Sequence, residues 1–242
     1  MRLAMEEVYA KAARDVVADL EIVLCEPKLD TEPADLARYR WLDRRWYARA
    51  TRQLERRGFR FLRDIDATAV TAKGAPPSCV RVLLSDDGCT AAALYQTVPR
   101  SPGPLMKVLL WLTGQWHKPR VVELSSYTED GRVVSTSNQG GLNQFSFPPN
   151  VSRRSLSLGA PVKELWSVHR SHLEGAGARA VRFQDFEGLE AAREAQRQKQ
   201  NAWRLEVGIL SEELDRLLAP HGAHGAAVRP HIERALAERR PR

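Results

Sequence analysis

Four polar side chains in the middle of the chain could form a small catalytic or binding pocket. They are a carboxylate, two hydroxyls and an amide on two runs of strand-forming residues: Glu123, Ser125, Thr136 and Asn138. The runs flank Asp130-Gly131, and Asp-Gly between such runs is the strongest short-range signal for a β-hairpin. If Asp130-Gly131 is a two-residue loop, Glu123 lies opposite Asn138 and Ser125 lies opposite Thr136, so that all four share one face.

This polar face of the hairpin has two interpretations. In the first, it lines a pocket in which the carboxylate and hydroxyls meet a base, and the candidate base is His169 on a helix predicted over residues 161–174. In the second, the hairpin is rich in Ser and Thr because it presents a sheet surface to solvent. We favour the second interpretation, and a one-residue bulge at the turn would shift the pairing in either case.

Other residues that could carry chemistry do not fall into a recognisable pattern. His169 and His172 are three residues apart, as are His221 and His224, but neither pair belongs to an HExxH motif and no CxxC motif accompanies them. The sequence also lacks a nucleophile elbow and the glycine-rich phosphate-binding motifs. We therefore expect no metal, no cofactor and no catalytic activity, with an enzyme that uses the hairpin pocket as an alternative.

A second group of residues could bind anions. A helix is predicted from about Thr31 to the residue before Gly58, and arginines recur on one side of it in a stripe about 60° wide. The arginines are Arg38, Arg45, Arg49, Arg52 and Arg56. Such a ridge could contact phosphates, with Trp41 at its edge for stacking. The interpretation that we favour is a solvated helix face, and nucleic acid is then not the expected partner.

A third group could touch a membrane surface. The segment Leu105–Trp116 is the most apolar part of the chain, but it is too short to span a bilayer. It could lie in the interface with Leu110, Trp111 and Trp116 among the lipid headgroups, or contact a protein partner. The alternative, which we favour, is a buried strand or a loop that covers the sheet.

Length and composition are those of a globular chain with an adequate core. The 242 residues are 43% hydrophobic and 28% charged, and the net charge of +7 is spread thinly over the middle of the chain. A thin excess of positive charge is only a weak indication of nucleic-acid binding. The amino terminus lacks the apolar region of a signal peptide, and no run approaches the length of a membrane span, so we expect a cytoplasmic protein.

The order of predicted elements indicates the fold class. Helices are predicted at both ends, and two hairpins with acidic turns, at Asp86–Gly88 and Glu129–Gly131, lie between them. In the first hairpin, a turn at residues 87–88 would place Cys79 opposite Gln96, and this pairing defines the expected register of its two strands. This order favours an α+β fold: an antiparallel meander of about five or six strands, N-terminal helices packed on it and a helical C-terminal extension. The expected division is an N-terminal helix over 1–30, an α+β core over 31–178 and the extension over 179–242.

One broader pattern is shared with other proteins. Gly58-Phe59, the acidic turn at 86–88, the run ExxSxxxDGxxxxTxN over Glu123–Asn138, Pro148-Pro149 and His169-Arg170 resemble a family of uncharacterised bacterial proteins over roughly residues 40–175. The resemblance supports the fold and implies no activity. We therefore expect a non-enzymatic binding or scaffold domain in a bacterial cytoplasm, with a protein partner or with self-association through the C-terminal helices. The alternatives are a peripheral membrane protein and an enzyme.

Overall fold

The structure is a computed structural model, and it describes residues 2–29, 32–67, 78–96, 119–140 and 145–239. The chain forms two compact units, which we describe separately. An α+β unit consists of residues 28–143 and 147–196. A helical unit consists of residues 1–27, 144–146 and 197–242, so the first helix groups with the C-terminal helices and not with the sheet.

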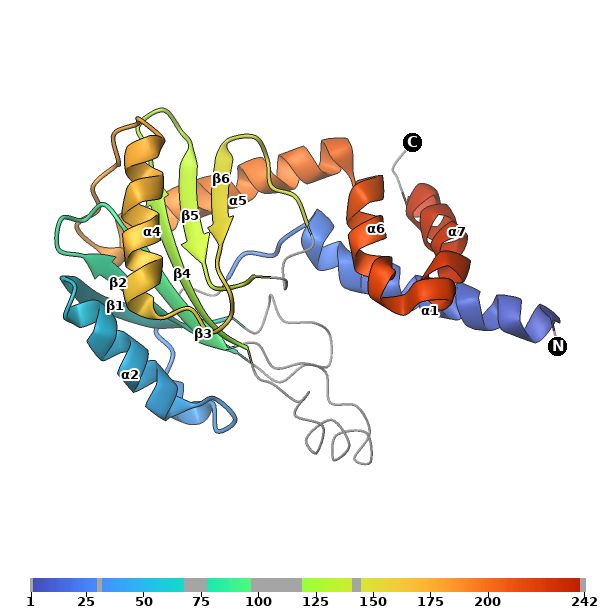
Figure 1. Cartoon of the computed structure of the whole chain (residues 1–242), viewed down its shortest axis with the longest axis horizontal. Coiled ribbons are helices and arrows are strands. Elements are labelled where there is room, and N and C mark those ends of the chain that lie inside the picture. Colours follow the sequence, from blue (N-terminus) through green and yellow to red (C-terminus); the bar gives the residue numbers. More distant parts are fainter. Residues whose placement is uncertain (1, 30–31, 68–77, 97–118, 141–144, 240–242) are drawn as a thin grey trace. The chain divides into compact units, whose positions relative to one another are not determined.

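The α+β unit contains one mixed sheet of six strands in sequence order (Figure 1). The strands are β1 (Phe59–Asp66), β2 (Cys79–Ser85), β3 (Ala91–Gln96), β4 (Arg120–Tyr127), β5 (Val133–Ser137) and β6 (Val151–Ser155). Neighbouring strands from β1 to β5 are antiparallel, as expected for a meander. The last pair, β5 and β6, is parallel. The α+β prediction is confirmed, whereas the prediction of a purely antiparallel sheet is wrong, because the chain crosses back after β5 before it pairs again.

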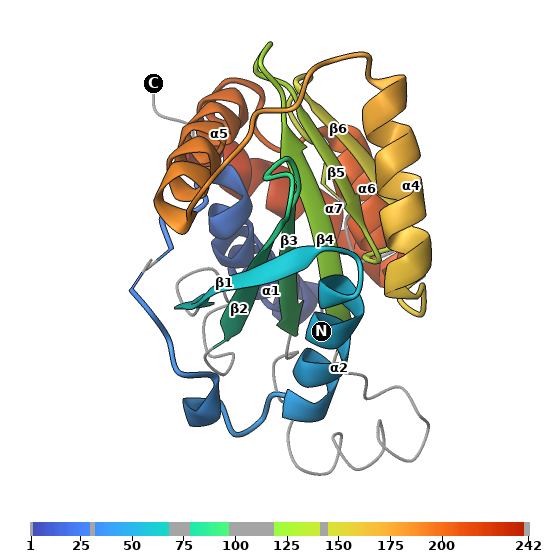
Figure 2. The same cartoon turned by 90° about the vertical axis from the view of Figure 1, so that its left-hand side faces the viewer.

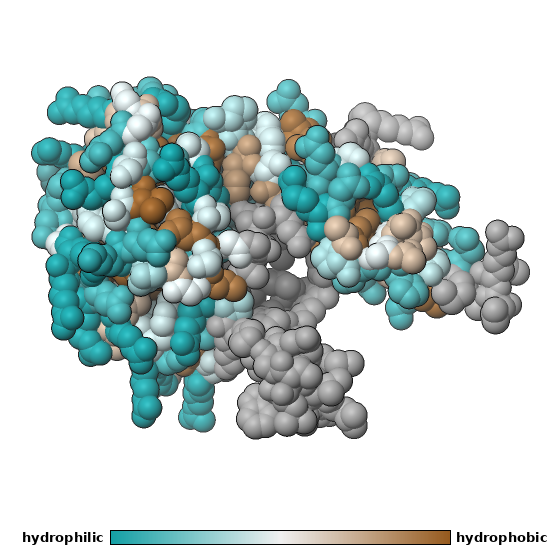
Figure 3. Space-filling model, in the orientation of Figure 1, coloured by the Kyte–Doolittle hydropathy of each residue, from teal (hydrophilic) through white to brown (hydrophobic). Residues whose placement is uncertain are grey.

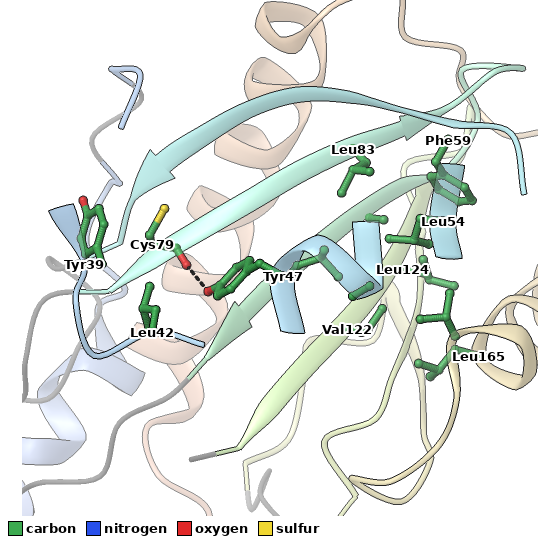
Figure 4. Close-up of a cluster of buried hydrophobic side chains, with 14 residues drawn as sticks. Tyr39, Leu42, Tyr47, Leu54, Phe59, Cys79, Leu83, Val122, Leu124 and Leu165 are labelled. Carbon is green, nitrogen blue, oxygen red and sulfur yellow. Dashed lines mark hydrogen bonds between the residues drawn. The ribbon is translucent and has the colours of Figure 1, made fainter. Parts of the chain in front are cut away.

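Two helices cover one face of this sheet: α2 (Arg44–Glu55) and α4 (Val162–Gly175). Tyr47 and Leu54 of α2 and Leu165 of α4 are fully buried against Leu83 and Leu124 of the sheet (Figure 4). The hydroxyl of Tyr47 donates a hydrogen bond of 2.8 Å to the backbone carbonyl of Cys79, so the polar end of this ring is satisfied inside the core. The apolar faces of the two helices therefore fix their position on the sheet.

The opposite face of the sheet carries a second, smaller core. Phe186 and Leu189, at the start of α5 (Phe186–Val207), pack with Ile65 and Val82 of the sheet and with Leu29. The sheet is therefore covered on both sides within this unit, with α2 and α4 on one side and the beginning of α5 on the other (Figure 2).

The predicted helix from Thr31 to Arg57 is two elements in the structure. A short 3-10 helix, η1 (Leu36–Arg38), comes first, and α2 begins only after Asp43. The Asp43 carboxylate accepts a hydrogen bond of 3.0 Å from the backbone N–H of Trp46, which caps the first turn of α2. Gly58 follows α2 at a φ of 79°, a value that favours glycine. The prediction of one continuous helix is therefore wrong at its start.

The helical unit has a core of its own. It contains α1 (Arg2–Leu24), α6 (Ser211–Leu218), the short η3 (Ala219–His221) and α7 (Gly222–Arg239), together with the last turns of α5. Val17 and Leu20 of α1 are buried with Leu214 of α6 and Ile232 of α7. Among the described residues, no helix is both long enough and apolar enough to cross a membrane.

Candidate functional site: a basic groove between two helices

A groove of about 900 Å³ lies between the end of α2 and the outer face of α4. Its cationic side chains come from both helices: Arg56 and Arg57 from the end of α2, and Lys163 and Arg170 from α4. The described residues that line it include a single carboxylate, that of Glu174. The remaining lining residues are neutral: Gln53, Pro161, Trp166, Ser167 and Ser171. We call this set of residues the basic groove.

An arginine ridge runs along α2 and ends at the basic groove. Arg45, Arg49, Arg52 and Arg56 are exposed, and each lies three or four residues after the one before, so they follow one side of the helix. None of the four forms a salt bridge with a described residue. Figure 3 shows hydrophilic side chains over the surface of α2, at the lower left of the view.

One predicted member of the ridge lies elsewhere. Arg38 belongs to η1 and not to α2, so helical spacing does not align it with the other four arginines. The segment Arg44–Arg57 holds six arginines and one acid, Glu55, which makes it strongly basic. Glu55 is exposed and forms no salt bridge with the described arginines. The ridge therefore presents nearly uncompensated positive charge.

Trp166 supplies an aromatic surface inside the basic groove. Its ring packs edge-on against Phe59, with ring centroids 5.1 Å apart, and lies nearly parallel to the ring of His169 at 6.3 Å. The side chain is only partly buried and lines the groove, so its remaining surface is open to a ligand. A partly buried indole beside several cations can stack on a planar group whose neighbours are anionic.

The hairpin residues that were predicted to share a face are divided between the two faces of the sheet. Glu123 lies opposite Ser137, and Leu124 lies opposite Thr136, one residue away from the predicted pairing. The loop has three residues and not two: the N–H of Thr128 bonds the carbonyl of Arg132, and Gly131 has a φ of 80°. The predicted register is therefore wrong, and Glu123 and Ser125 face away from Thr136 and His169.

Glu123 belongs to a polar network on the sheet face that carries the second core. It accepts hydrogen bonds from the hydroxyls of Tyr95 at 3.1 Å and Ser135 at 2.9 Å, and the Arg153 guanidinium lies 3.8 Å away. Arg153 also donates a 3.1 Å bond to the hydroxyl of Ser137 and stacks over Phe147. Residues of three different strands therefore hold this carboxylate, which was predicted as a pocket residue.

Asn138 connects three backbone segments. Its side-chain oxygen accepts a 2.8 Å bond from the N–H of Val122, and its amide nitrogen donates 3.0 Å bonds to the carbonyls of Arg120 and Leu158. Only 4% of its surface is exposed, and both of its side-chain N–H donors are already used. The geometry assigns it to the architecture of the sheet.

His169 and His172 lie on the buried face of α4, beside several hydroxyl groups of the sheet. The Nε2 and Nδ1 atoms of His169 are 3.0 Å and 3.2 Å from the hydroxyls of Ser126 and Thr136. The Nε2 atom of His172 is 2.8 Å from the hydroxyl of Ser152. Burial, and to a lesser degree the charge of His172, lowers the pKa of His169 to about 4, so this ring is neutral at pH 7. Among the described residues, no cluster of side chains could hold a metal ion.

Among the residues that line the basic groove, only Arg56 was predicted from the sequence as an anion contact. Lys163, Trp166, Ser167 and Arg170 recur at helical spacing on one side of α4, a signal that could have marked a polar face. These residues lie close to α2, which comes about a hundred residues earlier in the chain. This proximity depends on the order of the strands and cannot be predicted from the spacing of residues along the sequence. The membrane hypothesis rested on Leu110, Trp111 and Trp116, which lie outside the described residues.

Comparison with known proteins adds no further assignment. No family model, no curated protein and no solved structure matches this chain.

Proposed function

We propose that the chain is a binding module for single-stranded nucleic acid, with the basic groove and the arginine ridge of α2 as its contact surface. The observation that carries this proposal is the combination of two features. Four exposed arginines without carboxylate partners among the described residues lead into a groove that has four cations, with Arg56 common to both sets, and a partly buried tryptophan. The spacing of the arginines alone favoured a solvated helix face. The cations and the tryptophan that α4 adds beside them favour a binding surface instead.

Charge supplies the affinity in this proposal. The lining of the basic groove has four cationic residues and one acid, and the acid is weakly engaged because Glu174 lies 3.9 Å from Arg170 at an exposed position. Exposed cations without internal partners lose little when they contact a phosphate, and each contact releases counterions from the nucleic acid. Arginine also presents a planar fork that matches a phosphate better than lysine does.

Trp166 supports a single strand over a duplex. Bases of a duplex are stacked on each other, whereas an unpaired base can stack on an exposed aromatic ring, which contributes about 1–3 kcal/mol. Ser167 and Ser171, on the same side of α4, offer hydroxyls to the sugar–phosphate backbone. The groove has no dense set of amide or carboxylate groups that could read base edges, so we expect little sequence preference.

Fluorescence anisotropy of a labelled 12-nucleotide strand tests the proposal. We expect Arg49→Ala/Arg52→Ala to weaken binding and to reduce the slope of log affinity against log salt by about 1.4, since each single-strand phosphate contact contributes about 0.7. The matched control is Arg182→Ala/Lys199→Ala, which removes the same charge from exposed positions outside the ridge and the groove. Equal affinity of the two double variants would contradict the proposal.

The aromatic contribution needs a separate variant. We expect Trp166→Leu to weaken binding about 5-fold to 100-fold and Trp166→Phe to retain most of the affinity, because Phe keeps a ring for stacking. Circular dichroism checks that both variants keep the fold, since Trp166 also packs on Phe59. Binding of anionic vesicles without binding of nucleic acid would identify a membrane surface as the partner in place of a nucleic acid.

A further inference from the structure

We propose that Ser152 and His172 form a nucleophile–base pair that accepts the acyl group of a small carboxylic ester. The Ser152 hydroxyl is 2.8 Å from Nε2 of His172, within the range of a direct hydrogen bond. Ser152 is exposed on β6, whereas 6% of His172 is exposed. The reactive oxygen is therefore accessible while its base is held inside the unit.

The surroundings of His172 fix its orientation and its tautomer. The hydroxyl of Thr136 lies 3.5 Å from Nδ1 of His172. Because Nε2 faces the Ser152 hydroxyl, we assign the ring proton to Nδ1, which donates to Thr136. A proton on Nδ1 leaves the lone pair of Nε2 directed at the Ser152 hydroxyl, as a general base requires. The Thr136 hydroxyl stands here at the ring nitrogen that a carboxylate orients in other serine–histidine pairs.

The charge state of His172 suits the same role. Burial, followed by the nearby Arg154 guanidinium, lowers the pKa of His172 below its ordinary value of 6.5. The ring is therefore neutral at pH 7 and can accept a proton. His169, the other titratable group beside it, is also neutral at that pH because burial lowers its own pKa.

A substrate can approach from the open edge of the sheet. Among the described strands, β6 is the last, and no strand pairs with its outer edge. Ser152 lies opposite Val134 and Arg154 lies opposite Thr136, so the side chains of Ser152 and Arg154 project from the same face about 7 Å apart. Arg154 is exposed and can balance the negative charge that forms on the carbonyl oxygen of a bound ester.

The reaction is an acyl transfer in two steps. The Ser152 oxygen attacks the ester carbonyl while its proton passes to Nε2 of His172. The carbon–oxygen bond to the alcohol then breaks, and the alcohol takes that proton as it leaves an acyl-serine. Water attacks the acyl group in the second step, gives its proton to His172, and releases the carboxylic acid as Ser152 recovers the proton. No oxidant, reductant or metal is needed.

Covalent labelling with a fluorophosphonate probe tests the pair, because the probe reacts with an activated serine and can be located by mass spectrometry. We expect labelling at Ser152 that is lost in Ser152→Ala and unchanged in Ser155→Ala, which removes an exposed serine of the same strand that has no imidazole partner among the described residues. We expect His172→Gln to slow labelling at least 100-fold. Labelling of Ser152 at the rate of Ser155 would overturn the proposal.

A second variant guards against the case in which His172→Gln fails to fold. In Ser152→Cys the buried base stays in place, and the rate of alkylation by iodoacetamide reports the thiolate at each pH. We expect the midpoint of this rate profile to lie below about 8.5, the ordinary pKa of a thiol, because a neighbouring imidazole stabilises the thiolate when it takes the proton. A midpoint at the ordinary value would show that His172 does not activate position 152 and would overturn the proposal.

Discussion

Arg204 and Glu213 form a fully buried, two-bonded ion pair in the helical unit. The two terminal guanidinium nitrogens of Arg204 lie 2.9 Å from the two carboxylate oxygens of Glu213, and the side chains are 1% and 0% exposed. Glu213 also accepts the N–H of Leu210 at 2.8 Å and the N–H of Ser146, so the pair ties the end of α5, the start of α6 and the segment at Ser146 to each other.

We expect Arg204→Met to destabilise the helical unit by about 3–5 kcal/mol, because it leaves the Glu213 carboxylate buried without its partner. The double variant Arg204→Met/Glu213→Leu should lose less than Arg204→Met alone, since it removes both charges. Hydrogen exchange in peptides from α1 and α6 measures the loss, and it reads this unit separately from the sheet. A double variant that is less stable than the single variant would contradict this account of the pair.

The same pair makes the helical unit sensitive to acid. Burial alone would raise the pKa of Glu213, but the hydrogen bonds from Arg204 and from two backbone N–H groups lower it overall. A lowered carboxyl pKa contributes stability above the ordinary value of 4.5, and this contribution is lost as the pH falls. We expect hydrogen-exchange protection of α6 to decrease from pH 5 toward pH 3 in the wild type, and to change less in Arg204→Met/Glu213→Leu.

His169 should make the α+β unit less stable in mild acid. Its pKa is about 4 in the folded chain against 6.5 for an ordinary histidine, so the unfolded chain binds the proton first as the pH falls. The stability that neutral His169 contributes is complete above pH 6.5 and falls by about 3 kcal/mol as the pH decreases to 4. Urea unfolding between pH 7 and pH 4 measures this loss. We expect His169→Gln, which keeps a donor and an acceptor for Ser126 and Thr136, to make the free energy of unfolding less dependent on pH. If the variant lost as much stability as the wild type between pH 7 and pH 4, groups other than His169 would be responsible.

Gly88 is a position at which a single methyl group should be costly. Its φ is 71°, and a Cβ atom there would overlap the backbone carbonyl of Phe183, whose N–H in turn bonds the carbonyl of Gly88 at 2.9 Å. We expect Gly88→Ala to lower the free energy of unfolding of the α+β unit by about 2–4 kcal/mol. Gly159→Ala is the matched control, because φ is not positive there and its added methyl group meets no atom within 4 Å. Similar urea midpoints for both variants would contradict the prediction.

The two hairpins show how far sequence reasoning reaches. Both turns contain Asp-Gly, and the first pairs Val80 with Tyr95, the register that a turn at residues 87–88 predicts. The second turn has three residues in place of the predicted two, and the hydroxyl of Thr128 lies within hydrogen-bond distance of both the Asp130 carboxylate and the Arg132 carbonyl. A shift of one residue moves every side chain of a strand to the other face. Strand propensity does not reveal local side-chain hydrogen bonds of this kind. The predicted pocket depended on the register of the hairpin, which differs by one residue.

The arginine ridge and the basic groove could also be predicted only in part from the sequence. Helical periodicity placed Arg45, Arg49, Arg52 and Arg56 on one side of a helix, as the structure has them. It could not locate the cap at Asp43, which excludes Arg38 from the ridge. It also could not bring α4 beside α2, because packing between distant elements depends on how both helices cover the sheet. The part of the basic groove that comes from α4 was therefore visible only in three dimensions.

Asn138 decides between a pocket and an architectural role for the second hairpin. It makes three hydrogen bonds to the backbone, to Val122, Arg120 and Leu158, and it is buried. Asn138→Ala leaves those backbone groups without partners, so we expect a loss of about 3 kcal/mol in the free energy of unfolding of the α+β unit. Ser125→Ala is the control: this hydroxyl is partly exposed and bonds no described residue, and the change should stay within about 0.5 kcal/mol. If Asn138→Ala were as stable as Ser125→Ala under urea, the bonds of Asn138 would not hold the sheet together, and a ligand-binding role for this side chain would again have to be considered.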